Sequence, residues 1–295
     1  MNNNFEAVAS APRRRLVNVA ALAPLFAIVH ACGGGGGTGG TLPGDPGGAP
    51  GPPAPLPGGG TAWVLGQSAK RLWDFGAQGW AGGNAVTLAQ VEAGATLVLV
   101  VWGFQSSASP QHIFPDPLDS LGQGINVVAD TGHDARVPVQ LKAWVLHNAR
   151  AGDHSWSNLP DFTGGDGLLF FMEFRRAGVA SSRTLGAATI TLNAPRSPWL
   201  SAGSVTMSSG AAAGDLLVAC SFEEELSVGK PVTTYTDPPS GWSSVGVQTA
   251  SVDNIAGEVC WRIASDSSQK NVAWSWSITG NQDPTIFQAI IFAVA

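Results

Sequence analysis

Charged residues and cysteines are both scarce in this chain of 295 residues. Lys, Arg, Asp and Glu make up 12% of it, and it has three cysteines. Beyond residue 31 the basic residues form no group larger than a pair such as Arg175-Arg176, whereas nucleic-acid binding needs groups of Lys and Arg to neutralise phosphates. The motifs G-x-S-x-G, H-E-x-x-H and C-x-x-C and a phosphate-binding glycine loop are absent as well. The sequence therefore predicts no nucleic-acid partner and contains no recognisable catalytic motif.

A long apolar span is also lacking. The apolar run near the N-terminus covers residues 16–31, about 16 residues where a membrane-spanning helix needs roughly 20, and Pro24 and His30 interrupt it. Three arginines at 13–15 precede it, and a basic flank before a short apolar run is the layout of an export signal. We therefore predict that residues 1–31 are a signal peptide.

Val29-His30-Ala31-Cys32 resembles the lipobox of bacterial lipoproteins, although that family prefers a small residue at the position of His30. The resemblance implies that cleavage leaves Cys32 as the first mature residue, carrying several acyl chains that anchor it to a membrane. Gly33 stands where the family's inner-membrane proteins carry aspartate, which implies the outer membrane or the cell surface. The alternative is ordinary cleavage near Ala31, which leaves Cys32 as a free thiol.

Residues 32–61 are predicted to form a flexible linker. Residues 33–60 hold 14 Gly and 7 Pro among 28 residues, too few apolar groups to offset the entropy of ordering. Removal of residues 1–31 takes three arginines and one glutamate from 15 basic and 21 acidic residues, so the mature chain has a net charge of −8. Abundant Gly, Ser, Thr, Ala and Val are typical of an exported β protein.

Only Cys220 and Cys260 remain after Cys32, and in an oxidising compartment two cysteines suggest one disulfide. Cys220 shares strand parity with Val218 and Phe222, whereas Cys260 has the parity opposite to Trp261. The two thiols are therefore expected on different faces, which favours buried thiols over a bridge. The sequence leaves both possibilities open.

The chain resembles itself at a spacing near 119 residues. The matches occur in the same order in both halves: Leu65-Gly66 with Leu185-Gly186, Trp80 with Trp199, Val86-Thr87-Leu88 with Val205-Thr206-Met207, Ala93-Gly94 with Ala213-Gly214, Asp116-Pro117 with Asp237-Pro238, Trp144 with Trp261, and Ser155-Trp156-Ser157 with Ser275-Trp276-Ser277. We therefore predict two repeats, residues 62–181 and 182–295.

Each repeat is predicted to consist of short antiparallel strands. Residues 272–278 alternate large apolar with small or polar side chains, and turn-forming clusters separate such runs. The fold class is therefore all-β, with two tandem sandwiches of jelly-roll or immunoglobulin-like type. In the second repeat, "AAAGDLLVACSF", "TDPPSGWSSV", "GEVCWRIA" and "VAWSWSI" resemble a β-sandwich repeat common in bacterial exported, surface and phage-associated proteins.

All four histidines beyond residue 31 fall in the first repeat, at 112, 133, 147 and 154. Seven aspartates accompany them: Asp116, Asp119, Asp130, Asp134, Asp153, Asp161 and Asp166. If "WVLHNARAGDHSW" is a hairpin with its loop at residues 150–153, His147 lies opposite Trp156 and both His147 and His154 face the same side. Such a pair with a carboxylate could bind a transition metal, but a shift of one residue would separate the rings. We predict no metal and no cofactor.

Eleven tryptophans are the remaining excess. Trp144, Trp156, Trp261, Trp274 and Trp276 follow strand patterns and are expected in cores, whereas Trp63, Trp73, Trp80, Trp199 and Trp242 lie near predicted loops, where an exposed ring could stack on a sugar. The run Glu223-Glu224-Glu225 is expected to be a solvated loop rather than a cation site.

The sequence is most consistent with an exported, lipid-anchored protein that acts by adhesion or by binding a glycan or protein partner, without catalysis. The candidate binding residues are His147, His154, Trp156, Trp80, Trp199 and Trp242. The alternative is a carbohydrate-active lyase or hydrolase with its site in the first repeat, because its acid and base can be scattered in sequence.

Overall fold

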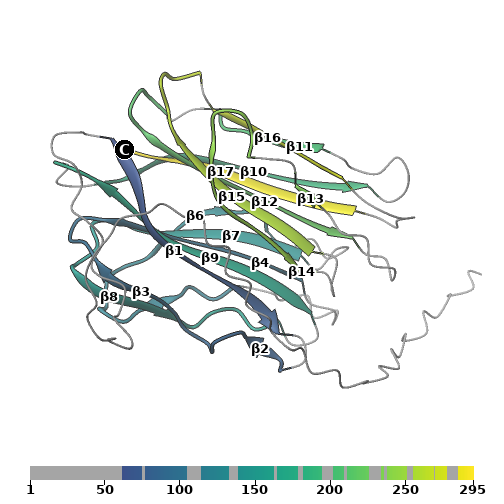
Figure 1. Ribbon diagram of the computed structural model, residues 1–295, viewed down its shortest axis with the longest axis horizontal. Helices are drawn as coiled ribbons and strands as arrows, with labels where there is room; N and C mark the ends of the chain where they lie inside the picture. The colour runs from purple at the N-terminus through teal and green to yellow at the C-terminus, as the bar shows by residue number, and fades with distance from the viewer. Residues whose placement is uncertain are drawn as a thin grey trace, which may run out of the picture. The chain divides into compact units, whose positions relative to one another are not determined.

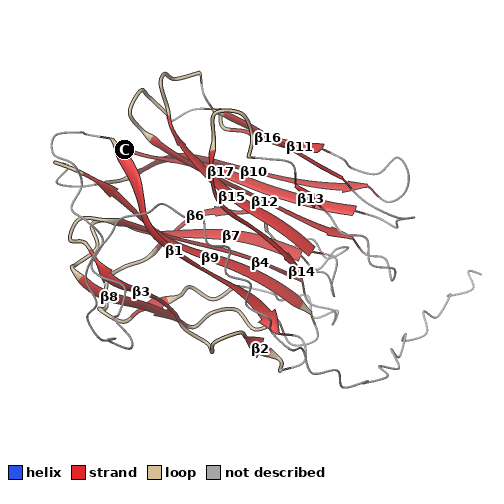
Figure 2. Cartoon of the chain, viewed as in Figure 1, coloured by secondary structure: helices blue, strands red, loops and turns tan. Residues whose placement is uncertain are grey.

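A computed structural model describes residues 62–74, 77–104, 114–132, 139–162, 165–178, 182–194, 202–208, 211–225, 234–235, 238–250, 255–268, 270–277 and 285–295. These residues form strands, turns and loops, and none of them is helical (Figures 1 and 2). The prediction of an all-β chain with antiparallel sheets is confirmed. Within the same ranges, no helix is long and apolar enough to cross a bilayer. The predicted signal peptide, Cys32 and the linker up to residue 61 lie outside the described residues.

The first half of the chain forms two antiparallel sheets. The larger has the order β2-β1-β9-β4-β7-β6 and the smaller the order β3-β8-β5. Their strands are β1 (Trp63–Asp74), β2 (Gly79–Trp80), β3 (Val86–Val91), β4 (Thr96–Phe104), β5 (Leu118–Asp119), β6 (Asn126–Asp130), β7 (Val139–Leu146), β8 (Gly152–Ser157) and β9 (Asp166–Arg176).

The second half also forms two antiparallel sheets, with the orders β10-β17-β12-β15-β14 and β11-β16-β13. Their strands are β10 (Thr184–Ala194), β11 (Ala202–Thr206), β12 (Leu216–Glu225), β13 (Thr234–Tyr235), β14 (Ser243–Ala250), β15 (Ile255–Ile263), β16 (Asn271–Ser277) and β17 (Thr285–Val294). If the short β2 is left out, each half has eight strands, and strands with the same rank along the chain occupy the same place in the sheets. The first strand of each half, for example, lies beside the last strand of that half, as β1 lies beside β9 and β10 beside β17.

The four sheets stack as layers. In Figure 1 they follow one another from β3 and β8 at the bottom, through the six-stranded and five-stranded sheets, to β11 and β16 at the top. Three clusters of buried apolar residues fill the three spaces. The first-half cluster contains Leu99 and Trp156, the central cluster contains Val100 and Phe222, and the second-half cluster contains Ala219 and Trp274.

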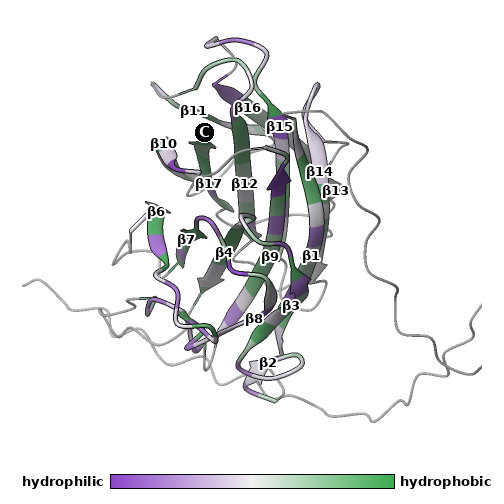
Figure 3. Cartoon of the chain, turned by 90° about the vertical axis from the view of Figure 1, so that its left-hand side faces the viewer, coloured by the Kyte–Doolittle hydropathy of each residue, from purple (hydrophilic) through white to green (hydrophobic). Residues whose placement is uncertain are grey.

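Strand alternation decides which cluster a side chain joins. On β4, Leu97, Leu99 and Val101 belong to the first-half cluster, whereas Val98 and Val100 belong to the central cluster. Since both faces of the large sheets are covered, inner strands such as β4 and β17 are nearly continuous apolar runs, as buried strands usually are. Figure 3 shows hydrophobic residues recurring along β4, β12 and β17.

Cys220 and Cys260 are free and buried on opposite faces of the five-stranded sheet, Cys220 in the central cluster and Cys260 in the second-half cluster. The expectation that they face different sides is confirmed. The match of Trp144 with Trp261 is wrong as a structural equivalence. Trp144 faces the first-half cluster, whereas Trp261 packs against the central one, because a shift of one residue moves a side chain to the other face.

Candidate functional site

His147 and His154 do not lie on one hairpin. His147 follows β7 of the six-stranded sheet, whereas His154 lies in β8, which pairs with β3 and β5 in the smaller sheet. The predicted pairing of His147 with Trp156 is therefore wrong, since Trp156 pairs with Val86 and Asp119. The chain between the two histidines crosses from one layer to the next instead of turning back within a sheet.

His154 is completely buried and bonded on both sides of its ring. Its Nδ1 lies 2.8 Å from Oδ1 of Asp119, and its Nε2 lies 2.8 Å from the carbonyl oxygen of Arg150. The other oxygen of Asp119 accepts hydrogen bonds from the backbone amides of Leu121 and Gln123. These contacts tie β8 to the loop after β5, so His154 serves the packing of the first half and is not open to a ligand.

His147 is half-buried and joins the two halves of the chain. Its Nδ1 lies 2.9 Å from the hydroxyl of Ser182, and its Nε2 lies 3.0 Å from the hydroxyl of Thr184. Ser182 also contacts the hydroxyl of Thr96 at 2.7 Å and donates its backbone amide to the side-chain oxygen of Asn148. Burial lowers the pKa of His147 below its ordinary value, so the ring is neutral at pH 7.

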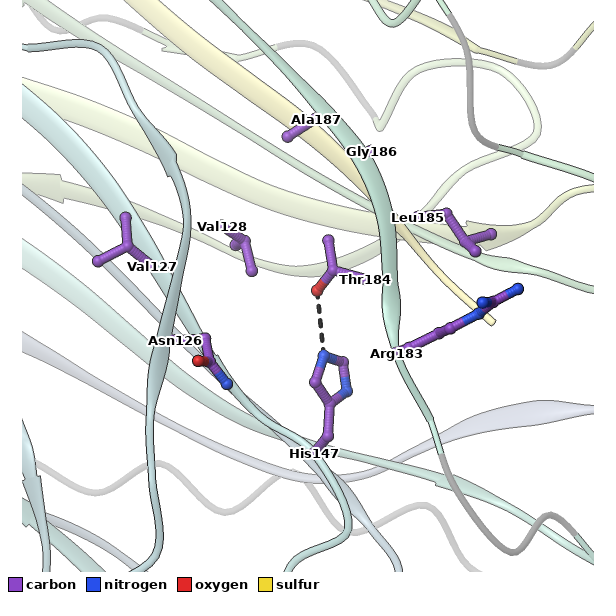
Figure 4. A pocket seen from close by; sticks show the side chains of 9 residues that line it. All are labelled: Asn126, Val127, Val128, His147, Arg183, Thr184, Leu185, Gly186 and Ala187. Atoms are coloured by element: carbon purple, nitrogen blue, oxygen red, sulfur yellow. Dashed lines mark hydrogen bonds between the residues drawn. The ribbon is translucent and has the colours of Figure 1, made fainter.

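An open pocket of about 400 Å³ lies beside His147, between β6 and β10 (Figure 4). β6 ends the six-stranded sheet and β10 ends the five-stranded sheet, so each presents a side with no neighbouring strand among the described residues. The lining residues are Asn126, Val127, Val128, His147, Arg183, Thr184, Leu185, Gly186 and Ala187.

The pocket combines an apolar strip with polar groups at one end. Val127 is 45% exposed, a high value for a large apolar side chain. Thr184 points its hydroxyl at the ring of His147, and the amide of Asn126 lies on the facing strand (Figure 4). Arg183 projects at the rim in the same view. The site can therefore offer hydrogen bonds and a positive charge beside an apolar surface.

The candidate tryptophans that the structure describes do not form a sugar-stacking surface. Trp80, Trp156 and Trp242 are 4%, 0% and 7% exposed. Trp80 donates its indole N–H to the carbonyl of Pro160, and Trp242 lies under the guanidinium of Arg262. Trp63 and Trp73 are buried too. Trp199 lies outside the described residues, as do His112 and His133.

A second polar cluster lies at the edge of the first-half cluster. The ammonium of Lys142, a residue 7% exposed, lies 3.5 Å from Oδ1 of Asp116 and 3.8 Å from Oδ2 of Asp130. It also donates to the carbonyl of Phe114 and lies 5.0 Å from the centre of the Trp144 ring. The positive charge of Lys142 and the negative charges of the two aspartates compensate each other, so this cluster holds β7 against the end of β6.

A third cluster joins β9 to β1 and β3. Arg175 bonds both carboxylate oxygens of the fully buried Glu173, at 2.9 and 2.8 Å, and it also pairs with Glu92. Gln67 donates to Glu173 at 2.7 Å. Both carboxylate oxygens of Glu173 thus accept hydrogen bonds, and the guanidinium of Arg175 compensates its buried charge.

Within the described ranges, no group of three or more His, Cys, Asp or Glu side chains is placed to hold a metal ion. Comparisons of the chain with protein-family models, with curated proteins and with solved structures give no match. What the pocket between β6 and β10 can bind is therefore inferred from its geometry.

Sequence reasoning selected His147 but missed Asn126, Arg183 and Thr184. These residues come together because the edges of two sheets lie side by side, and no short motif encodes that arrangement. The sequence signal that pointed to this site was the position of His147 directly after a buried strand. The expectation of a solvated loop at residues 223–225 is wrong, since they lie in β12 and Glu223 is 1% exposed.

Proposed function

We propose that this chain is an exported, lipid-anchored binding protein, built from two tandem β-sandwich domains, that recognises an extended segment of a partner protein at the pocket between β6 and β10. The observation that carries the proposal is the position of the pocket between two sheet edges. A strand that adds to such an edge gains backbone hydrogen bonds, and pockets for alternate side chains give specificity.

The common strand order of the two halves supports two domains of one ancestry, and it favours repeats at residues 62–181 and 182–295. The lipobox-like stretch ending at Cys32 and the Gly/Pro-rich segment after it support anchoring through a tether. Both features fit a protein that presents a recognition surface away from a membrane.

A protein segment is favoured over a glycan because the pocket lining contains no aromatic side chain apart from the His147 ring, which Ser182 and Thr184 hold. The exposed Val127 suits an apolar partner residue, and Arg183 at the rim suits an acidic one. We therefore expect the partner segment to alternate apolar and acidic residues.

The recognition proposal is tested by selecting peptides from a displayed random library against the Cys32→Ala protein and measuring their affinity by calorimetry. Val127→Lys should weaken the selected peptides at least tenfold, because it places a charge on the apolar strip. Val247→Lys, at a second exposed valine on the opposite sheet edge, is the matched control and should leave the affinity unchanged. Equal affinities in both variants would refute recognition at this pocket.

Two further measurements address the other parts of the proposal. Mass spectrometry of the mature N-terminus should find acylated Cys32, and an unacylated residue at the start would contradict anchoring. A glycan array followed by product analysis tests the alternative. Release of shortened sugars, abolished by His147→Ala, would replace binding by a carbohydrate-active enzyme.

A further inference from the structure

Glu258 lies in the interior of the second half. It belongs to β15 and pairs across the ladder with Ser221 of β12, while Glu223 pairs with Ala256 two positions along. Alternate residues of a strand share a face, so Ser221, Glu223 and Glu258 face the second-half cluster, as their neighbours Ala219 and Cys260 do. Their exposed fractions are 0%, 1% and 0%.

The surroundings of Glu258 do not suit a negative charge. The polar groups nearest to its carboxyl are the hydroxyl of Ser244 and the indole of Trp274, and neither makes a well-aligned hydrogen bond with it; the hydroxyl of Ser221 opposite has no partner in the described structure. Burial raises the pKa of Glu258 above its ordinary value, and the nearby hydroxyl of Ser244 and indole of Trp274 offset only part of that effect. A buried polar group without partners is costly and calls for a physical explanation.

The equivalent position in the first half is compensated. Lys142 of β7 pairs with Val101 of β4, and Glu258 of β15 pairs with Ser221 of β12. The two residues occupy equivalent positions, because Lys142 faces the first-half cluster as Glu258 faces the second-half cluster. The ammonium of Lys142 reaches two aspartates and a carbonyl oxygen. The two halves thus bury an ionisable residue at the same place, and only that of the first half has partners for its charge.

No cation in the described part of the chain forms an ion pair with Glu258. On β15 itself, Cys260 and Arg262 share its face, and Arg262 lies over the ring of Trp242. On β12 the ionisable residue on this face nearest to Glu258 is Glu223, which is acidic. The strand β17 contributes only apolar residues to this cluster, and β14 and β16 contribute Ser244 and Trp274. Burial is therefore the main cost of ionising Glu258, and no described cation offsets it.

We propose that Glu258 is a carboxylic acid rather than a carboxylate in the folded second half, and that this half loosens as rising pH removes the proton. A neutral carboxyl has an O–H that can donate to the hydroxyl of Ser221, whereas a carboxylate can only accept. Ionisation would leave a buried charge beside Glu223. An exported protein that meets changing external pH would respond through this position.

The sign of the effect follows from proton linkage. The pKa of Glu258 is raised on folding, so the folded state binds the proton more tightly than the unfolded state, whose pKa is close to the ordinary 4.5. The stabilisation is complete below that value and is lost as pH rises toward the folded-state pKa. The folding equilibrium constant should fall by about tenfold per pH unit within this window.

The test compares urea unfolding of the Cys32→Ala protein, with and without Glu258→Gln, from pH 5 to pH 9. Glutamine keeps the shape of the side chain but does not titrate. The folding constant of the protein with Glu258, divided by that of Glu258→Gln, should therefore fall as pH rises. Asp266→Asn is the matched control, because Asp266 is exposed and its pKa is lowered, which confines its effect to acid pH. A pH-independent ratio for Glu258→Gln would overturn the proposal.

A second measurement does not depend on the variant folding. The infrared carbonyl band of a protonated carboxyl should persist in the native protein at pH values at which the urea-unfolded protein has lost it, and should be missing from native Glu258→Gln. Its absence would show that Glu258 is ionised. A rise in melting temperature with added Ca²⁺ at pH 8, lost in Glu258→Gln, would show that a cation rather than a proton compensates the carboxylate, and would equally overturn the proposal.

Discussion

At the scale of single residues, the buried ionisable side chains of the first half have partners, and the pair of His154 and Asp119 is the most deeply buried. Both side chains are inaccessible to solvent. The carbonyl of Arg150 and the carboxyl of Asp119 each lie 2.8 Å from one ring nitrogen, so both nitrogens are hydrogen-bonded. Within this buried contact, the ring and the carboxyl each depend on the other.

Removal of one partner should therefore be severe. His154→Ala is expected to lower the free energy of unfolding by about 2–5 kcal/mol, because it removes a fully buried side chain and leaves the buried Asp119 carboxyl without its partner. Ser157→Ala, at an exposed position of the same strand, should change it by less than about 0.5 kcal/mol. Urea unfolding at pH 7 measures both. Similar losses in the two variants would mean that His154 contributes no more than a surface side chain.

The two thiols of the second half should be unreactive in the folded protein. Burial raises the pKa of Cys220 and of Cys260 well above the ordinary value, and reaction requires an accessible thiolate. In the Cys32→Ser protein, a thiol reagent should label neither residue without denaturant and both in urea. A protein lacking free thiols in urea would instead contain a disulfide, against the placement of the two residues on opposite faces.

At the scale of elements, close packing between strands and aromatic rings depends on glycine. A Cβ added to Gly103 of β4 would lie 2.0 Å from Cε1 of Phe162, whereas one added to Gly124 would meet no atom within 4 Å. Phe162 also packs edge-on against Trp73 and Trp80, so it has little room to move.

Gly103→Ala is accordingly expected to lower the free energy of unfolding by about 1–3 kcal/mol or more through overpacking. Gly124→Ala, the control, should have little effect or stabilise slightly, because alanine restricts the unfolded chain. Thermal melts of the two variants against the parent protein provide the comparison. A tolerated alanine at position 103 would show that the ring of Phe162 can move aside.

The strands and their inward faces could be predicted from sequence, whereas strand pairing could not. The alternation around Trp274 correctly indicated a half-buried strand, with Val272 and Trp274 inside and Ala273 and Ser275 exposed. Alternation states which face a residue occupies but not which strand lies beside it. The hairpin predicted around His147 failed for that reason. The pocket between β6 and β10 was out of reach because it depends on how two sheets pack.

At the scale of the whole described chain, the central cluster makes each half part of the other's core. Trp102 of the first half stacks on Phe222 of the second, with ring centres 5.9 Å apart and planes within 9°. The sequence predicts that residues 182–295 fold alone, yet one face of their large sheet contributes Leu216, Val218 and Phe222 to this shared cluster. The shared burial implies that the stability of one half depends on the other.

This dependence can be measured with a double-mutant cycle. Trp102→Ala and Phe222→Ala should each lower the free energy of unfolding by about 3–5 kcal/mol, because each removes a buried ring from the same contact. Residues in contact are not additive, so the double variant should lose less than the sum by about 0.5–3 kcal/mol. Tryptophan fluorescence, to which six residues of the first half and five of the second contribute, should also show a single urea transition in the Cys32→Ser protein. Labelling of Cys220 and Cys260 in the second half should report the same midpoint, as one cooperative unit requires. Additive losses together with two separate midpoints would instead establish that the halves are stable independently and that the central cluster is only a contact between them.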